Sequence, residues 1–118
     1  MDANWDNLYL REIVWAGTSR LRIGYQVDAE ARVAVLGSFY NVGGSGVFTT
    51  HHWLYESKHG ILHCSYTCGR AIEHLQRGTF RRMAEYQVLL DSGLTFAQVV
   101  DHIVQWRLAE LRSMFGEE

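Results

Sequence analysis

The regular alternation of residues 20–27, RLRIGYQV, restricts the fold more than any other feature of this 118-residue sequence. The apolar side chains fall two residues apart, at Leu21, Ile23, Tyr25 and Val27, and polar ones fall between them, at Arg20, Arg22 and Gln26. A period of two is typical of a strand with one buried face. The turn-forming residues 28–30 then lead into the apolar stretch 31–40, so we expect a β-hairpin.

Other stretches of the N-terminal half are also predicted to join this antiparallel sheet. Residues 8–16, LYLREIVWA, could form a strand or a helix, and their β-branched and aromatic content favours the strand. Residues 37–46 are rich in glycine, and we interpret them as a turn because they lack the closing lysine of a phosphate-binding loop. Residues 47–55 and 61–65 are expected to form a second hairpin around residues 57–60.

The hydrophobic period changes from two to about 3.6 near Cys68. The residues that share the predicted helical face are Cys68, Ile72, Leu75, Met83, Tyr86 and Leu90. Thr67 is the expected N-cap of this helix, and Gly78 is expected to bend or split it.

A further helix is expected from Thr95 to about residue 115. Thr95 and Gln98 match a capping box, in which each side chain bonds to the backbone N–H of the other residue. The predicted apolar face comprises Phe96, Val99, Val100, Ile103, Trp106, Leu111 and Met114. We therefore predict one α+β domain over residues 1–118, in which a small antiparallel sheet of about four to five strands in the N-terminal half packs against two C-terminal helices.

The composition favours a compact globular protein and argues against several other classes. Hydrophobic residues make up 47% and charged residues 20% of the chain, which argues against disorder. The formal net charge of −2 provides no general attraction to nucleic acid or anionic membranes. We expect no membrane span and no signal peptide. The chain has only two cysteines, so we expect free thiols in a reducing compartment.

Residues 51–64, HHWLYESKHGILHC, contain four histidines and Cys64, and Cys68 follows four residues later. A thiol becomes nucleophilic when a helix N-terminus or a neighbouring histidine lowers its pKa. Cys68 is the better candidate because it follows the expected cap, Thr67, in the first turn of a predicted helix. Cys64 belongs to a predicted strand and lacks a helix terminus.

Strand register decides which of these histidines come together. A two-residue turn at 57–58 places His52 opposite His63 on one face, where one imidazole could act as a base and the other could orient it. A loop one residue longer instead puts His51 and Trp53 on the face of His63. Both registers are compatible with the sequence.

Two interpretations of this cluster involve no thiol chemistry. In the first, the histidines and cysteines are ordinary members of half-buried strand and helix faces. In the second they bind zinc, and the candidate ligands are His51 or His52, His63, Cys64 and Cys68. No second pair of ligands follows at the spacing of a zinc finger, so we expect neither a metal nor another cofactor.

Two short motifs in this region resemble those of a known family. Residues 52–55, HWLY, with residues 60–63, GILH, resemble the H-box of the lecithin:retinol acyltransferase-like proteins, and residues 67–78, TCGRAIEHLQRG, resemble their NC box. Within that family the chain is most similar to the compact picornavirus 2A proteins of the H-box/NC type. The resemblance implies a degenerate papain-like or NlpC-type fold. It also implies that Cys68 is the nucleophile, His52 its base and His63 the third member of a triad.

The same resemblance implies a function. It points to a viral non-structural protein of the host-cell cytoplasm, or of replication membranes, that acts in replication and host-factor interaction without protease activity. The expected partners are host proteins, viral replication proteins or lipid. The alternative is a cysteine-dependent phospholipid acyltransferase or hydrolase that uses Cys68 with His52 and His63. The short segment 64–67 between the motifs favours interaction, because it leaves no strands there to shape a lipid pocket.

A weaker indication concerns RNA. Arg70, Arg77, Arg81 and Arg82 recur at about helical spacing. Four arginines on one helix face can contribute salt-dependent contacts to phosphates even when the whole chain is mildly acidic. The alternative interpretation is a solvated helix face.

Overall fold

The computed structural model describes residues 3–42, 45–66 and 70–115, with residues 41, 42 and 45–49 described by their backbone only. In this part of the chain, six antiparallel strands form one sheet in the order β1-β2-β3-β4-β5-β6. The strands are β1 (Val14–Gly17), β2 (Leu21–Asp28), β3 (Val33–Val42), β4 (Ser45–Ser57), β5 (Gly60–Tyr66) and β6 (Arg81–Arg82). The helical elements are η1 (Leu8–Leu10), α1 (Ala71–Gln76), α2 (Ala84–Asp91) and α3 (Phe96–Phe115).

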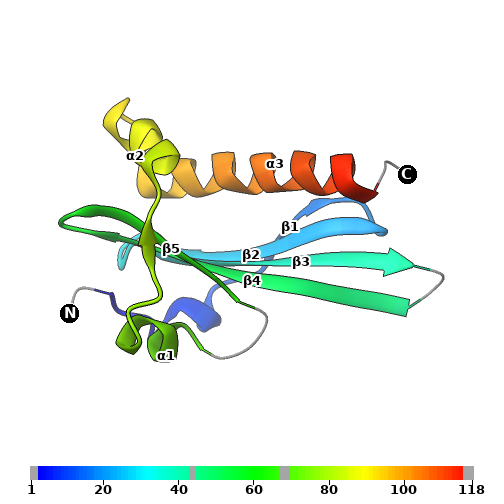
Figure 1. Cartoon of the computed structure of the whole chain (residues 1–118), viewed down its shortest axis with the longest axis horizontal. Coiled ribbons are helices and arrows are strands. Elements are labelled where there is room, and N and C mark those ends of the chain that lie inside the picture. The colour runs from blue at the N-terminus through cyan, green and yellow to red at the C-terminus, as the bar shows by residue number, and fades with distance from the viewer. Residues whose placement is uncertain (1–2, 43–44, 67–69, 116–118) are drawn as a thin grey trace.

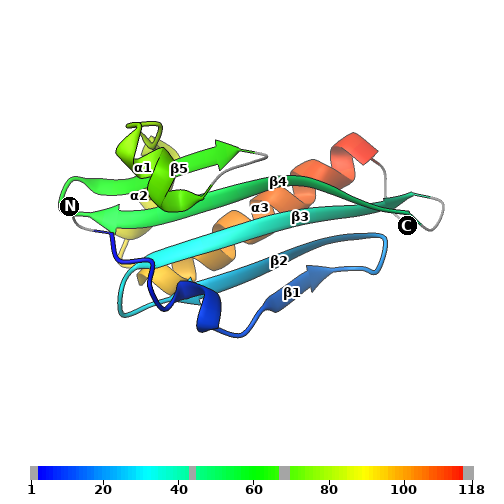
Figure 2. The same cartoon turned by 90° about the horizontal axis from the view of Figure 1, so that it is seen from below.

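The sheet separates two helical layers (Figure 1). α2 and α3 lie over one face, and η1 and α1 lie against the other. Seen from the side of η1 and α1, α3 crosses the strands obliquely behind the sheet (Figure 2). Because side chains alternate along a strand, neighbouring residues of the sheet point into two different cores.

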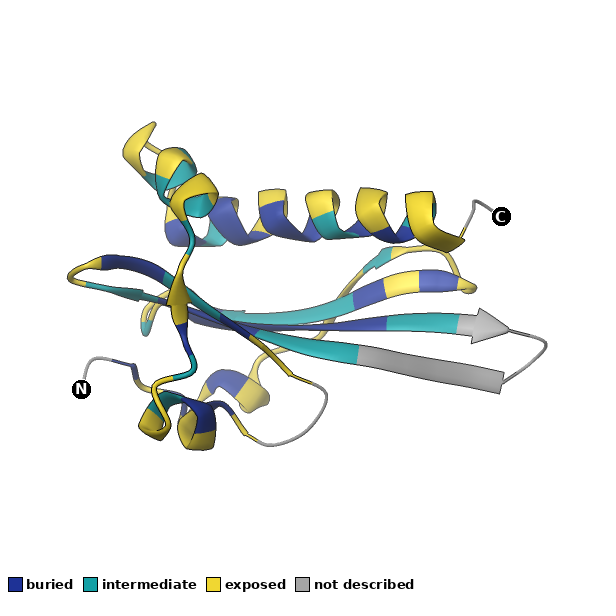
Figure 3. Cartoon of the chain, viewed as in Figure 1, coloured by how far each residue is buried: buried dark blue, intermediate teal, exposed yellow. Residues whose placement is uncertain are grey.

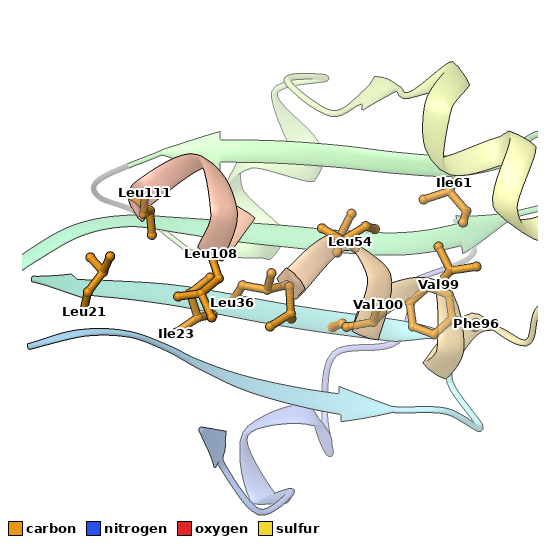
Figure 4. Packing of buried hydrophobic residues seen from close by; sticks show 13 residues of the cluster. Leu21, Ile23, Leu36, Leu54, Ile61, Phe96, Val99, Val100, Leu108 and Leu111 are labelled. Atoms are coloured by element: carbon orange, nitrogen blue, oxygen red, sulfur yellow. The ribbon is translucent and has the colours of Figure 1, made fainter. Parts of the chain in front are cut away.

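The larger core lies between the sheet and α3 (Figure 4). Its buried residues are Leu21, Ile23, Ala34, Leu36, Leu54, Ile61, Phe96, Val99, Val100, Ile103, Val104, Leu108 and Leu111. α3 begins with the predicted capping box, since the backbone N–H of Gln98 donates to Thr95 Oγ1 at 3.2 Å and the backbone N–H of Thr95 donates to Gln98 Oε1 at 2.9 Å. The alternation of residues 20–27 is confirmed too, because Leu21 and Ile23 are buried in this core.

Two members of the predicted apolar face of α3 do not join this core. Trp106 is 45% exposed and Met114 is 62% exposed. Val104 and Leu108, which were not predicted, are buried instead. The residues of α3 that contact the sheet follow a spacing of three and four residues. Figure 3 shows buried residues along the side of α3 that faces the sheet and exposed ones along its outer side.

The second core lies on the opposite face of the sheet, under η1 and α1. Its buried residues are Ala3, Trp5, Leu8, Val33, Val35, Trp53, Tyr55, Cys64, Ala71 and Phe80. η1 is held there by side-chain hydrogen bonds. Trp53 Nε1 donates to the hydroxyl of Tyr9 at 3.0 Å, and Gln26 Nε2 donates to the carbonyl of Arg11 at 2.8 Å.

Gly78 was predicted to bend or split the helix after residue 68, and the structure has two helices there with a short strand between them. α1 ends at Gln76, and the chain then crosses the edge of the sheet as β6, which pairs with β5. α2 follows on the other face. Gly78 lies between the two helices. Leu75, before it, packs against the core under α1, whereas Tyr86 and Leu90, after it, pack against the core beneath α3. β6 also raises the number of described strands above the predicted four to five.

Three smaller differences concern the ends of elements. Residues 8–16 divide into η1 and β1 instead of forming one strand. Most of the predicted turn at 37–46 is strand, because β3 continues to Val42 and β4 begins at Ser45. Thr67, the predicted cap, lies outside the described residues, and Arg70 occupies the N-cap of α1. No helix in the described part of the chain is long and apolar enough to cross a membrane.

Candidate functional site

The turn between β4 and β5 sets the register of the histidine-rich hairpin. Ser57 pairs with Gly60, so the turn residues are Lys58 and His59. Gly60 has a φ of 118°, a conformation that glycine adopts at little cost. The turn therefore lies one residue later than the predicted turn, which shifts the pairing of the two strands by two residues.

A two-residue shift leaves His52 and His63 on the same face of the sheet, because side chains alternate with a period of two. His63 is opposite Leu54, and His52 is opposite Ser65. The two imidazoles are diagonal neighbours, with His52 Nδ1 3.0 Å from His63 Nε2. Their rings stack with centroids 5.3 Å apart and an angle of 21° between the planes. One imidazole therefore donates a hydrogen bond to the other.

The histidine pair lies on the face of the sheet that α2 and α3 cover. His52 pairs with Leu36 of β3, which belongs to the core beneath α3. The ring of Tyr86, from α2, meets the ring of His63 edge to face at 6.0 Å. Arg107, from α3, forms an ion pair with Glu110. The pair is thus half-buried on the face that carries two helices outside the motif.

Burial and positive charge both keep these imidazoles neutral. The pKa of His52 is lowered to about 3, chiefly by burial, with further contributions from His63, Arg107 and His51. Burial also lowers the pKa of His63, and the charge of Arg107 acts in the same direction, whereas Glu85 opposes it. His52 Nε2 is buried and has no hydrogen-bond partner among the described residues. At neutral pH the pair is an uncharged polar cluster inside the fold.

Cys64 lies on the opposite face from its neighbour His63. It pairs with Trp53, and its Sγ lies 3.6 Å from Thr79 Oγ1 in the core under α1. Burial raises the pKa of this thiol. Because His63 and Cys64 point away from each other, they cannot both be ligands in the alternative interpretation that involves zinc. In the described ranges, no group of three or more histidine, cysteine or acidic residues is placed to hold a metal ion.

Cys68 itself lies outside the described residues, but the chain on both sides of it can be placed. Before it, the ring of Tyr66 stacks on His74 of α1, with centroids 4.3 Å apart. After it, Ala71 packs in the core with Trp53. These contacts all lie on the face opposite His52 and His63.

The four arginines predicted to share a helix face are distributed over separate elements. Arg70 and Arg77 flank α1 at its two caps, and Arg81 and Arg82 form β6. All four are exposed. Arg70 borders a hollow of the surface.

The structure also reveals a feature that the motifs do not indicate. Two hollows of about 350 Å³ and 230 Å³ lie side by side on the sheet face that carries η1 and α1, and Tyr9 and His51 line both of them. We call this surface the aromatic groove and define it by its rings, which belong to Tyr9, Trp15, Phe39, His51 and Trp53. The sequence indicates this groove only through His51 and Trp53, which are two residues apart and therefore share the strand face opposite His52.

Gly24 shapes one end of the aromatic groove. A Cβ at this position would lie 2.8 Å from the ring of Trp15 on the adjacent strand. Trp15 therefore lies flat over the glycine, and Arg22 stacks on the ring at 4.2 Å from its centroid.

We expect Gly24→Ala to displace the Trp15 ring toward solvent, because a Cβ cannot share its position. Trp15 is already 47% exposed and can swing outward, so the loss of unfolding free energy should stay within about 1 kcal/mol. The measurement is a red shift of tryptophan emission. The same substitution in a Trp15→Phe background should produce no red shift, and an equal shift there would contradict this account.

Comparisons with protein-family models, with curated proteins and with solved structures found no match for the chain. Functional inference therefore depends on the chemistry and placement of its own residues.

Proposed function

We propose that the chain is an H-box/NC-type protein that acts by non-covalent binding instead of thiol chemistry. In this proposal it belongs with the picornavirus 2A proteins of that type, and its partners are host proteins or viral replication proteins. The observation that carries the non-covalent part is the placement of the motif residues. His52 and His63 point toward α3, whereas Tyr66 and Ala71, on either side of Cys68, pack on the opposite face.

The order of elements supports the family part of the proposal. The H-box residues form a hairpin of β4 and β5, and the NC-box residues that the structure describes continue into a helix, α1, that packs on the same sheet. A degenerate papain-like or NlpC-type fold would have this order, with a histidine-bearing hairpin followed by a helix that the cysteine opens.

The alternative function is hydrolysis or acyl transfer by Cys68 with His52 and His63. A base must come within hydrogen-bond reach of its nucleophile, directly or through one water. His52 Nδ1 is already engaged with His63, and its other ring nitrogen, Nε2, is buried. The depressed pKa of His52 also makes it a weak base. These features favour binding over catalysis.

The pH dependence of Cys68 alkylation tests the proposal. Without an activating histidine, the rate should rise with the thiolate fraction and reach half its maximum near about pH 8.5. Peptide mass spectrometry after iodoacetamide treatment measures the rate at Cys68 separately from the rate at Cys64. The buried Cys64 serves as a slow internal reference.

Two controls separate the alternatives. His52→Gln and His63→Gln should leave the alkylation midpoint of Cys68 unchanged, and phospholipid or ester turnover should equal that of Cys68→Ala. A midpoint two or more pH units lower that returns toward the ordinary value in either histidine variant would establish the thiol mechanism instead.

A further inference from the structure

The aromatic groove has the shape and rigidity of a preformed ligand site. Its two hollows meet at Tyr9 and His51, and the larger, about 350 Å³, lies within the range of small-molecule pockets. Tyr9 is fixed by the hydrogen bond from Trp53 Nε1, and the His51 and Trp53 rings are 5.6 Å apart. The second hollow continues to Trp15 and Phe39, whose rings are 5.5 Å apart. Five rings therefore follow one another along the same sheet face.

The charged side chains that line the first hollow or stack at the end of the second are arginines. Arg70 lines the first hollow, and Arg22 stacks on Trp15 at the far end of the second. Arg22 also lies opposite Phe39 in the strand pairing, which places its side chain on the groove face. No acidic residue lines either hollow among the described residues. The groove thus combines planar apolar rings with a guanidinium group at each end.

We propose that the aromatic groove binds nucleotides. The bases stack on the exposed ring of Tyr9 and on the face of Trp15 that Arg22 covers, and the guanidinium of Arg22 moves from that face to a phosphate. A further phosphate meets Arg70. Exposed aromatic rings flanked by arginines on a sheet form the platform on which unpaired bases stack, whatever their sequence. His51 lies at the junction of the two hollows, and burial lowers its pKa.

This ligand chemistry has two sources, a free mononucleotide and single-stranded nucleic acid. The two hollows adjoin at Tyr9 and His51, which suits successive nucleotides of one strand. A duplex hides its base faces and does not suit the groove. The overall charge of −2 makes the local arginines, and not the whole surface, responsible for attraction to phosphate.

The test measures fluorescence anisotropy of a labelled single-stranded octamer at about 50 mM salt, with AMP and an unlabelled duplex as competitors. We expect Trp15→Ala to weaken octamer binding by roughly 5- to 150-fold, as loss of one stacked base predicts. Arg22→Ala should also make the dependence of log K on log salt shallower by about 0.7. Trp15 and Arg22 are both exposed, so these variants should fold.

Matched controls are available on the other side of the molecule. Trp106 on α3 is 45% exposed, close to the 47% of Trp15, and Trp106→Ala should leave octamer binding unchanged. Arg20 lies over Tyr40, on the α3 side of the sheet. Arg20→Glu should therefore weaken octamer binding far less than Arg22→Glu, although both change the net charge equally.

Each outcome has a defined meaning. If the octamer binds much more tightly than AMP, the ligand is single-stranded nucleic acid, and if the two bind equally, it is a mononucleotide. Absence of binding by both, equal effects of Trp15→Ala and Trp106→Ala, or equal binding of duplex and single strand would overturn the proposal. So would a wild-type dimer that Trp15→Ala converts to a monomer, because the groove would then be a self-interface. Cys68 alkylation tests the proposed function independently of these results.

Discussion

Leu54→Ala should reduce the unfolding free energy by about 2–5 kcal/mol, the usual cost of truncating a fully buried leucine. Leu54 has no exposed surface and lies at the centre of the core between the sheet and α3 (Figure 4). It pairs with Ala34 of β3, whose side chain is too small to fill the resulting cavity. Removing the side chain therefore costs both the buried apolar area and the contacts of the atoms around it.

Urea unfolding followed by circular dichroism measures this loss. Ile13→Ala is the matched control, because Ile13 is 48% exposed beside the edge strand β1 and its truncation should change stability by no more than about 0.5 kcal/mol. Equal effects of the two substitutions would mean that α3 does not seat on Leu54 in solution.

Acidification should destabilise the fold between pH 7 and pH 5 through the histidine pair. In the unfolded chain His52 takes up a proton near its usual pKa of about 6.5, whereas in the folded protein its pKa is lowered to about 3. Over this window the unfolded state binds more protons, so stability falls as the pH falls. His52 alone should contribute a loss of about 2 kcal/mol, and His63, whose pKa is also lowered by burial, adds to it.

Unfolding free energies of the wild type and of His52→Gln at the two pH values measure this effect. Glutamine keeps a polar side chain but cannot take up the proton, so the variant should lose about 2 kcal/mol less than the wild type on going from pH 7 to pH 5. The unfolding free energy of the double variant His52→Gln/His63→Gln should change even less between the two pH values. A wild type equally stable at both pH values would show that the imidazoles are not buried as a neutral pair.

Much of the secondary structure could be predicted from local patterns. The alternation at residues 20–27 identifies a strand and its buried face, and the pairing of Thr95 with Gln98 identifies the start of α3. Both patterns involve residues that are close together in the sequence, and no distant contact overrides the local preference at either place. The exposure of Trp106 and Met114 could not be predicted in this way, because rotation of a helix about its axis is set by the surface on which it packs.

The candidate site was predictable only in part. The approach of His52 and His63 was predicted by one of the two registers that the sequence allowed, and a shift of two residues from that register keeps them on one face. The two helices on that face could not be deduced, because Arg107 and Tyr86 come from elements far along the chain. The aromatic groove escapes sequence analysis for a related reason. Its rings come from η1 and three strands, and no local spacing links them.

The sequence by itself therefore determined most of the order of elements, although η1 and β6 were not predicted, and the chemistry that alternate positions of each strand offer. Those properties follow from backbone periodicity and capping, which act over a few residues. Only the tertiary structure decided that α3 covers the face of His52 while α1 packs on the face of His51 and Trp53. That choice depends on which apolar surfaces meet across the sheet. It leaves one histidine pair half-buried on the side of α3 and an open groove of aromatic rings on the other side.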